Sequence, residues 1–266
     1  MSDNLASKVK QWLDEKSGYP LEMATAAALQ RTGFEVVQGD YFPDSKTGEL
    51  REIDVTGYVA YVENDVQISV AFLVECKSSV KWPWLLFTSA MDYAKNLAVV
   101  RRSTSSLGQR ILNKLQFETT VQNSPLFALP TRCGYAMAAG FREPNDIDPT
   151  YAALTGICAG TLGHINRLAA LTQPKLVPFD WPVLVIKAPL LECQMGSDGK
   201  TVVGEIDHGT LVWRNPILNR HTIIDVYRES AFVAALPELK AAALAFSRTA
   251  HAAHFGLRGG ECSGGG

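Results

Sequence analysis

Two apolar segments decide the fold of this chain: EIDVTGYVAYV (residues 52–62) and QISVAFLVECK (residues 67–77). Both are rich in the β-branched and aromatic residues that favour strands. Between them lie Asn64 and Asp65, two residue types suited to the left-handed backbone of a two-residue hairpin turn. The sequence therefore predicts an antiparallel hairpin.

The register of this hairpin brings charged side chains together. With the two turn residues in the loop, Asp54 lies opposite Glu75 and Glu52 opposite Lys77. Because side chains alternate along a strand, Asp54, Glu75 and Lys77 should emerge on one face, with the two acidic Cβ atoms about 5 Å apart. Opposed carboxylates repel each other, so we expect a compensating cation, and hard oxygen ligands suit Mg²⁺ or Mn²⁺. A single bulge would move Asp54 to the other face.

An acidic residue on a strand, followed after a hairpin by Glu75-Cys76-Lys77, resembles the active-site signature of the PD-(D/E)xK, or restriction-endonuclease-like, nuclease superfamily. The resemblance covers residues 18 to 90. It implies that Asp54, Glu75 and the backbone carbonyl of Cys76 bind the metal, and that Lys77 orients the attacking water or neutralises the phosphate. The family often adds a Glu on the preceding helix, and Glu22 matches it.

The chain departs from the family pattern at two points. The literal Pro-Asp dipeptide is Pro43-Asp44, but DYFPDSKTG (residues 40–48) has the composition of a loop, so we prefer Asp54. No clear glutamine-containing motif follows, and Gln109 is a poor candidate for it. Glu22 also has a purely structural interpretation, because a carboxylate in the first turn complements the helix dipole.

The whole pattern predicts an α/β fold with a mixed central sheet flanked by helices: a restriction-endonuclease-like core with a helical insertion and a C-terminal strand extension. We expect one elaborated domain over residues 1–255. It comprises a catalytic core at about 18–90, a helical insertion at about 85–180, and a sheet extension with a closing helix at about 181–255. The glycine-rich residues 256–266 are expected to be disordered.

The spacing of apolar residues and the positions of Gly and Pro predict the individual helices and strands. Helices are expected over residues 4–17, 21–32, 85–115 with an interruption, 146–172 and 230–252. Strands are expected over residues 34–37, 131–141, 182–191, 211–214 and 222–227, with a turn at 195–200.

Candidate nucleic-acid contacts follow the hairpin. Lys81, Trp82 and Trp84 lie around a proline, where tryptophans could stack on bases, although such residues more often pack a loop against the core. The segment from 85 to 115 is the most basic in the chain, and a solvated helix face explains its charge about equally well. We expect contacts to phosphates there from Arg101, Arg102, Arg110 and Lys114.

The composition is that of an ordinary soluble protein: 266 residues, 47% hydrophobic, 20% charged and a formal net charge of −2. No apolar run approaches the roughly 18 residues of a membrane span, and the polar start is unlike a signal peptide, so we expect a cytoplasmic protein without membrane contact. Five scattered cysteines indicate buried free thiols. His251 and His254 are three apart but lack a third ligand nearby in the sequence, so they are weak metal candidates.

These observations favour a Mg²⁺- or Mn²⁺-dependent phosphodiesterase, foremost a DNA endonuclease of restriction, phage defence or repair. Two alternatives stay open. One is an RNA nuclease with the same site. The other is a non-catalytic nucleic-acid-binding or assembly module in which the acidic residues form an ordinary ion-pair network, for example Glu52 with Lys77. The expected partner is nucleic acid, and a homodimer or a partner subunit is compatible with the sequence.

Overall fold

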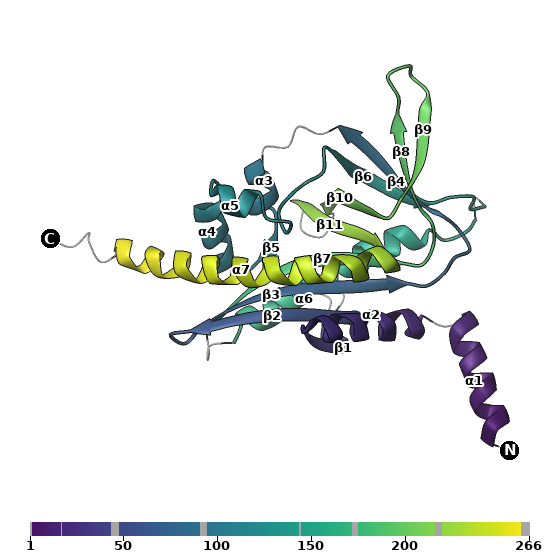
Figure 1. The fold of residues 1–266 in the computed structure, drawn as a ribbon, viewed down its shortest axis with the longest axis horizontal. Helices are drawn as coiled ribbons and strands as arrows, with labels where there is room; N and C mark the ends of the chain where they lie inside the picture. Colours follow the sequence, from purple (N-terminus) through teal and green to yellow (C-terminus); the bar gives the residue numbers. More distant parts are fainter. Residues whose placement is uncertain are drawn as a thin grey trace.

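The computed structural model describes residues 2–16, 18–43, 48–90, 95–143, 145–171, 175–215 and 220–261. They form an α/β fold in which one large mixed sheet carries helices on both faces (Figure 1). Its strands are β1 (Glu35–Pro43), β2 (Leu50–Glu63), β3 (Val66–Lys77), β4 (Trp84–Ala90), β5 (Ser103–Thr104), β6 (Arg132–Ala139), β7 (Lys175–Ile186), β8 (Leu190–Met195), β9 (Thr201–Ile206), β10 (His208–Asn215) and β11 (Arg220–Arg228). The expected mixed sheet with flanking helices is confirmed.

The helices are α1 (Ser2–Lys16), α2 (Tyr19–Thr32), α3 (Lys95–Val100), α4 (Ser106–Leu115), α5 (Thr119–Gln122), α6 (Pro149–Ala169) and α7 (Glu229–Glu261). The strands run in the order β1-β2-β3-β7-β11-β10-β6-β4-β8-β9, and β5 pairs with β7. The strands β1, β2 and β3 are antiparallel neighbours, whereas β3 and β7 are parallel. Since parallel neighbours need a crossover connection, the chain between β3 and β7 is long and contains α6.

The hairpin forms in the predicted register. Glu63 pairs with Val66, and the ladder continues without a shift to Val55 and Val74. Asn64 and Asp65 have φ of 51° and 61°, the left-handed conformations that a tight two-residue turn requires. The turn chemistry thus fixes which residues of the two strands oppose each other.

The alternation of side chains breaks at Asp54, just beyond the last pair of that ladder. Val55 faces the core beneath α2 and α7, yet Ile53, two residues away, packs in the core beneath α6. Opposite Asp54, Gly39 of β1 has a φ of +60°, a second irregularity at the same level. The Asp54 carboxylate accepts a hydrogen bond from the backbone N–H of Cys76 at 2.7 Å. The sequence placed Asp54 directly opposite Glu75, whereas the ladder ends at the pair of Val55 with Val74, and the Asp54 carboxylate contacts the backbone of Cys76.

Two apolar cores lie on the two faces of the sheet. On one face, α2 and α7 cover residues such as Val70, Phe72 and Val74 of β3. On the other face, α6 covers Ala71 and Leu73. Figure 1 shows α7 lying across one face and α6 behind the sheet. Each core therefore uses alternate residues of the same strands, as expected for a sheet buried on both faces.

Helix α2 is held close to β2, which fixes the position of its first turn. Gly33 ends the helix with φ of +86°, directly after the predicted helical residues 21–32. A Cβ atom on Gly57 of β2 would lie 2.7 Å from a methyl group of Leu29. A larger residue at this position would force Leu29 to move, so the glycine allows the close packing of helix on strand.

Several boundaries differ from the sequence expectations. Residues Trp84–Ala90 form β4 instead of the start of a helix, and β6 also joins the sheet, so the segment 85–180 is not a purely helical insertion. The loop expected from residue 40 does not begin there, because β1 continues to Pro43. Asp44 lies outside the described residues.

The last helix, α7, is longer and more apolar than expected. It continues to Glu261, past the predicted end at 252 and into the segment expected to be disordered; residues 262–266 lie outside the described part. Over Glu229–Phe255 it is long and apolar enough to pass as a membrane span, so the expectation that no segment reaches this length and composition is wrong. Phe232, Leu236 and Ala243 are buried against the sheet, which explains the apolar composition by packing.

Candidate active site

The four predicted catalytic residues gather at the end of the hairpin where β3 stops. Glu75 and Lys77 are in the last three residues of β3, Asp54 lies on the neighbouring strand β2, and Glu22 is in the first turn of α2. A Cβ atom added to Gly18 would lie 3.2 Å from a carboxylate oxygen of Glu22 and 3.9 Å from the hydroxyl oxygen of Ser78. Because Ser78 directly follows β3, Glu22 lies near the end of that strand. We name Glu22, Asp54, Glu75 and Lys77 the acidic cluster.

Lys77 pairs with Glu75 inside this cluster. Its Nζ lies 2.5 Å from Oε1 of Glu75, and the side chains are 33% and 13% exposed. Glu52, which the register placed opposite Lys77, instead accepts a hydrogen bond from the hydroxyl of Tyr41 at 3.1 Å. The ion pair between Glu52 and Lys77 that the non-catalytic alternative proposed is thus replaced by one between Glu75 and Lys77.

The carboxylates of the acidic cluster hold their protons unusually tightly. Burial, followed by the charges of Asp54 and Glu52, raises the pKa of Glu22 to about 7. Burial raises the pKa of Asp54 and of Glu75, and the charge of Asp54 adds to the effect on Glu75. The nearby positive charge of Lys77 lowers all three values but does not offset these effects. Three carboxylates and one lysine leave an excess of negative charge in a partly desolvated place.

The oxygen atoms of the cluster fit a hard divalent cation. One oxygen of Asp54 is occupied by the N–H of Cys76 and one of Glu75 by Lys77, so each carboxylate retains a second oxygen. Carboxylate and backbone carbonyl oxygens are the ligands that Mg²⁺ prefers, and it commonly binds only one or two carboxylates. Within the described ranges, no group of three or more His, Cys, Asp or Glu side chains is close enough to hold a metal unaided. The Cys76 carbonyl and bound water would therefore have to complete the coordination.

Two of the predicted nucleic-acid contacts are buried. Trp84 is 3% exposed and packs in the core beneath α6, as the structural alternative for a tryptophan beside proline predicted. Arg102 is 2% exposed. The expectation that these two side chains contact nucleic acid is therefore corrected, because neither reaches the surface.

The other predicted contacts reach solvent but lie in two places. Lys81 is exposed, with Nζ 4.0 Å from the ring centroid of the half-buried Trp82, shortly after the end of β3. Arg101 contacts Nδ1 of His221 at 3.2 Å, and the exposed Arg110 and Lys114 are on α4. Figure 1 shows α3 to α5 beside the C-terminal half of α7, at the end of the sheet away from the first turn of α2. Only Lys81 and Trp82 follow the acidic cluster directly.

Comparisons with family models, with curated proteins and with solved structures find no match to this chain.

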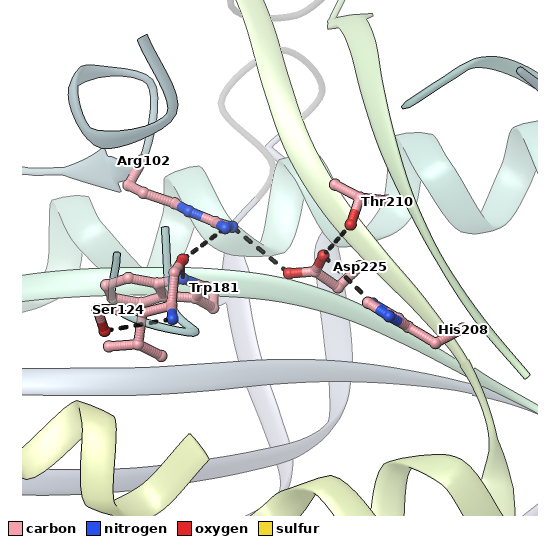
Figure 2. Close-up of polar contacts among 7 residues, drawn as sticks. Arg102, Ser124, Trp181, His208, Thr210 and Asp225 are labelled. Carbon is pink, nitrogen blue, oxygen red and sulfur yellow. Dashed lines mark hydrogen bonds and ion pairs between the residues drawn. The ribbon is translucent and has the colours of Figure 1, made fainter. Parts of the chain in front are cut away.

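A second charged cluster, which the sequence reasoning missed, surrounds Asp225 on β11. Figure 2 shows its carboxylate between Arg102, Thr210 and His208. Thr210 donates a hydrogen bond to Asp225 at 2.9 Å, while Arg102 and His208 lie 3.5 and 3.6 Å away. A charged residue inside the apolar run Ile223 to Tyr227 is a signal that could have identified it, because an unpaired Asp is almost never buried.

Two further histidines have structural partners, and the described cysteines are free thiols. Nδ1 of His164 lies 2.8 Å from the buried carboxylate of Asp180, so this histidine has a structural partner in the core. His251 contacts the backbone carbonyl of Glu63 at 3.0 Å and stacks edge-on with Tyr61, which explains it without a metal. The described cysteines are buried free thiols, as predicted: Cys76, Cys133, Cys158 and Cys193.

Proposed function

We propose that this protein is a metal-dependent phosphodiesterase, foremost a DNA endonuclease, whose active site is the acidic cluster. The observation that carries the proposal is the imbalance of charge: within the described part of the chain, Lys77 is the one cation that lowers the pKa values of Glu22, Asp54 and Glu75, and these values remain raised. A structural ion-pair network would balance its charges, whereas a site for a divalent cation needs this excess.

The arrangement of the elements supports a restriction-endonuclease-like core. Helix α2 is followed by β1 and then by the β2–β3 hairpin, which is the order that the resemblance implies. The helix packs on these strands, so its first turn brings Glu22 to the end of β3. All four residues thus come from the segment on which the resemblance rests.

Each side chain has a distinct role in this proposal. Asp54, Glu75 and the carbonyl of Cys76 would hold Mg²⁺ or Mn²⁺, which when bound lowers the pKa of a coordinated water and offsets the charge of the phosphate. Lys77, held by Glu75, presents a positive charge to the phosphate oxygens. With a pKa of about 7, Glu22 can accept or release a proton near neutral pH.

Lys81 and Trp82 are the proposed contacts to the substrate nearest the cleavage site. Lys81 would bind a backbone phosphate, and the half-buried Trp82 would pack on a base or sugar. Arg101, Arg110 and Lys114 would contact phosphates farther along a longer substrate. We place this activity in the cytoplasm, with roles in restriction, phage defence or repair.

A supercoiled-plasmid nicking assay tests the proposal. Asp54→Asn is the most informative variant, since the amide keeps an oxygen that can accept the Cys76 N–H while the charge is lost. With Mg²⁺ or Mn²⁺, the wild type should nick the plasmid, and Asp54→Asn and Lys77→Met should lower the rate about 100-fold or more. The exposed Glu143→Gln serves as the matched control and should cleave at the wild-type rate. Undiminished nicking by both variants would reject the assignment.

The same assay with single- and double-stranded RNA of matched sequence tests the RNA nuclease alternative. Faster cleavage of RNA than of DNA would favour that alternative with the same residues.

The non-catalytic module is favoured by one observation, the ion pair between Lys77 and Glu75. If this pair is only structural, the protein should bind nucleic acid without cutting it under every divalent cation tested. Binding without cleavage in Mg²⁺, Mn²⁺ and Ca²⁺ would therefore support the module.

A further inference from the structure

Phe141, the second residue after β6, combines an exposed ring with a strained backbone. At 88%, it is the most exposed large apolar side chain of the described residues. Its φ is +58°, in the left-handed region that a bulky side chain rarely adopts and that glycine adopts without strain. A ring in solvent adds nothing to the core, and strained residues of this kind gather at functional sites. The folding of the chain therefore gives no reason for a phenylalanine at this position.

Polar contacts on both sides hold the backbone around Phe141. The backbone N–H of the preceding Gly140 donates to the carbonyl of Pro83 at 2.8 Å. On the other side, Nη2 of Arg142 lies 3.3 Å from the carboxylate of Asp148, the N-cap residue of α6. Both neighbours of Phe141 are thus anchored, which fixes the left-handed conformation that turns the ring out of the fold.

The first of these contacts joins Phe141 to the proposed substrate contacts. Pro83 directly follows Trp82, and Nζ of Lys81 lies 4.0 Å from the centroid of the tryptophan ring. A Cβ atom added to Gly140 would lie 3.2 Å from a side-chain carbon of Pro83, so the two segments touch. Two aromatic residues and a lysine therefore lie on adjoining segments.

The second contact joins Phe141 to the helix beside the acidic cluster. Helix α6 begins at Pro149, and a Cβ atom added to Gly156 of this helix would lie 3.9 Å from a carboxylate oxygen of Glu75. The rise from Pro149 to Gly156 is about 10 Å, at about 1.5 Å per residue. That equals about three base steps of 3.4 Å. A base that Phe141 contacts would therefore lie within a few nucleotides of the proposed cleavage point.

Stacking on a nucleobase is the interaction that suits an exposed aromatic ring beside such a site. It tolerates any base, because every base has a π-face, and it commonly changes affinity about tenfold per base. In a paired duplex the neighbouring bases cover both faces of each base. A ring on a surface loop therefore reaches only a base that is unpaired or has left the stack.

We propose that Phe141 stacks on an unpaired base close to the cleaved phosphate, so that the preferred substrate is DNA with unpaired bases near the point of cleavage. This inference rests on the proposed function and names its substrate class. Lys81 would hold a phosphate of the same strand. Phe141 is thus a positioning residue: it orients the strand, whereas the acidic cluster carries the chemistry.

Fluorescence anisotropy in Ca²⁺, with the full chain, tests the preference without requiring cleavage. Two labelled duplexes of the same sequence are compared, one fully paired and one with a single unpaired base. The wild type should bind the second about tenfold more tightly, and Phe141→Gly should bind both equally. Equal affinities in the wild type, or an undiminished preference in Phe141→Gly, would overturn the proposal.

Two further variants test whether the aromatic ring itself matters. Phe117, beyond the end of α4, is 73% exposed and has no positive φ, so Phe117→Gly is the matched control. Phe141→Tyr keeps the ring. Both variants should retain the preference of the wild type, and its loss in either would contradict stacking by Phe141.

Thermal melts separate a lost contact from a lost fold. Both glycine variants gain the same freedom in the unfolded chain, but only Phe141→Gly relieves a left-handed backbone. The Tm of Phe141→Gly should therefore exceed that of Phe117→Gly. A lower Tm would mean that the Phe141 ring stabilises the fold, and would overturn its assignment to a ligand.

Nicking of plasmid DNA in Mg²⁺ or Mn²⁺, measured beside these titrations, separates this proposal from the nuclease function. A preference that depends on Phe141, without cleavage, would support the stacking site and reject the nuclease. Cleavage without the preference would support the nuclease and overturn the stacking site. Failure of the wild type to bind either duplex would overturn both.

Discussion

Glu75 and Asp225 lie on opposite faces of one sheet, and the two charged clusters around them differ in their balance of charge. At the end of β3, Asp54 and Glu75 meet a single lysine, and burial raises the pKa of both. On β11, Asp225 lies beside Arg102 and His208, and its pKa is lowered despite its burial. The same residue type therefore behaves in opposite ways, according to whether the fold provides enough positive charge around it.

This difference separates two uses of a buried carboxylate. A balanced group such as Asp225 is stable as an anion without a bound cation. An unbalanced group such as Glu75 is destabilised as an anion until a cation binds. The two clusters should therefore respond in opposite directions when one of their carboxylates is removed or when metal is added.

The largest expected effect is the loss of stability when Asp225 is removed. Asp225→Ala leaves Arg102 charged and buried without a counterion, which should lower the free energy of unfolding by about 3–5 kcal/mol. Urea denaturation measures it. Asp207→Ala is the control, because Asp207 and its partner Arg228 are 70% and 33% exposed and exposed pairs contribute little. Equal free energies of unfolding for the two variants would mean that the Asp225 carboxylate does not stabilise the buried Arg102.

Metal should stabilise the acidic cluster by the next largest amount. At a Mn²⁺ concentration of about 100 times the dissociation constant, binding to the native state adds about 2.7 kcal/mol. Thermal melts in Mn²⁺ and in chelator should show this as a higher Tm, and the gain should be greater at pH 8 than at pH 6 because protons compete for the carboxylates. If Glu75→Gln shows the same increase in Tm with Mn²⁺ as the wild type, Glu75 does not bind the metal, and the proposed difference between the two clusters is wrong.

A smaller effect should follow from Glu22 in the metal-free protein. Its pKa of about 7 in the folded state exceeds the ordinary 4.5, so the folded protein binds this proton more tightly than the unfolded chain. The contribution of this group to stability is full below about pH 4.5 and is lost as the pH rises through about 7.

Glu22→Gln should accordingly stabilise the metal-free protein at pH 8, by about 1 kcal/mol after allowance for solvent screening, and hardly at all at pH 5. Chemical denaturation at the two pH values measures the difference. A destabilisation at pH 8 would mean that Glu22 is well compensated where it lies.

The parts of the site that the sequence predicted correctly depend on local chemistry. Asn64 and Asp65 specify a turn with both residues in the left-handed region, and that turn sets the register of β2 against β3. Gly33 ends α2 where its pattern predicted. Because α2, β1 and the hairpin follow one another directly in the sequence, the first turn of α2 brings Glu22 near the end of β3.

The errors concern contacts between segments that are distant in the sequence. Arg102 appeared to be one of several surface charges, but its partner Asp225 lies far along the chain and buries it. Trp84 begins a strand that pairs with β6 and β8, so it enters the core. The break in alternation at Asp54 involves Gly39 on another strand, and no property of the hairpin itself indicates it.

The most direct test of the acidic cluster as a metal site is calorimetric titration of the metal-free protein with Mn²⁺, with Asp54→Asn measured in parallel at pH 7.5. We predict saturable binding to the wild type and the loss of that binding in Asp54→Asn. Identical titration curves for the two proteins, or no binding of Mn²⁺ to the wild type, would contradict the account.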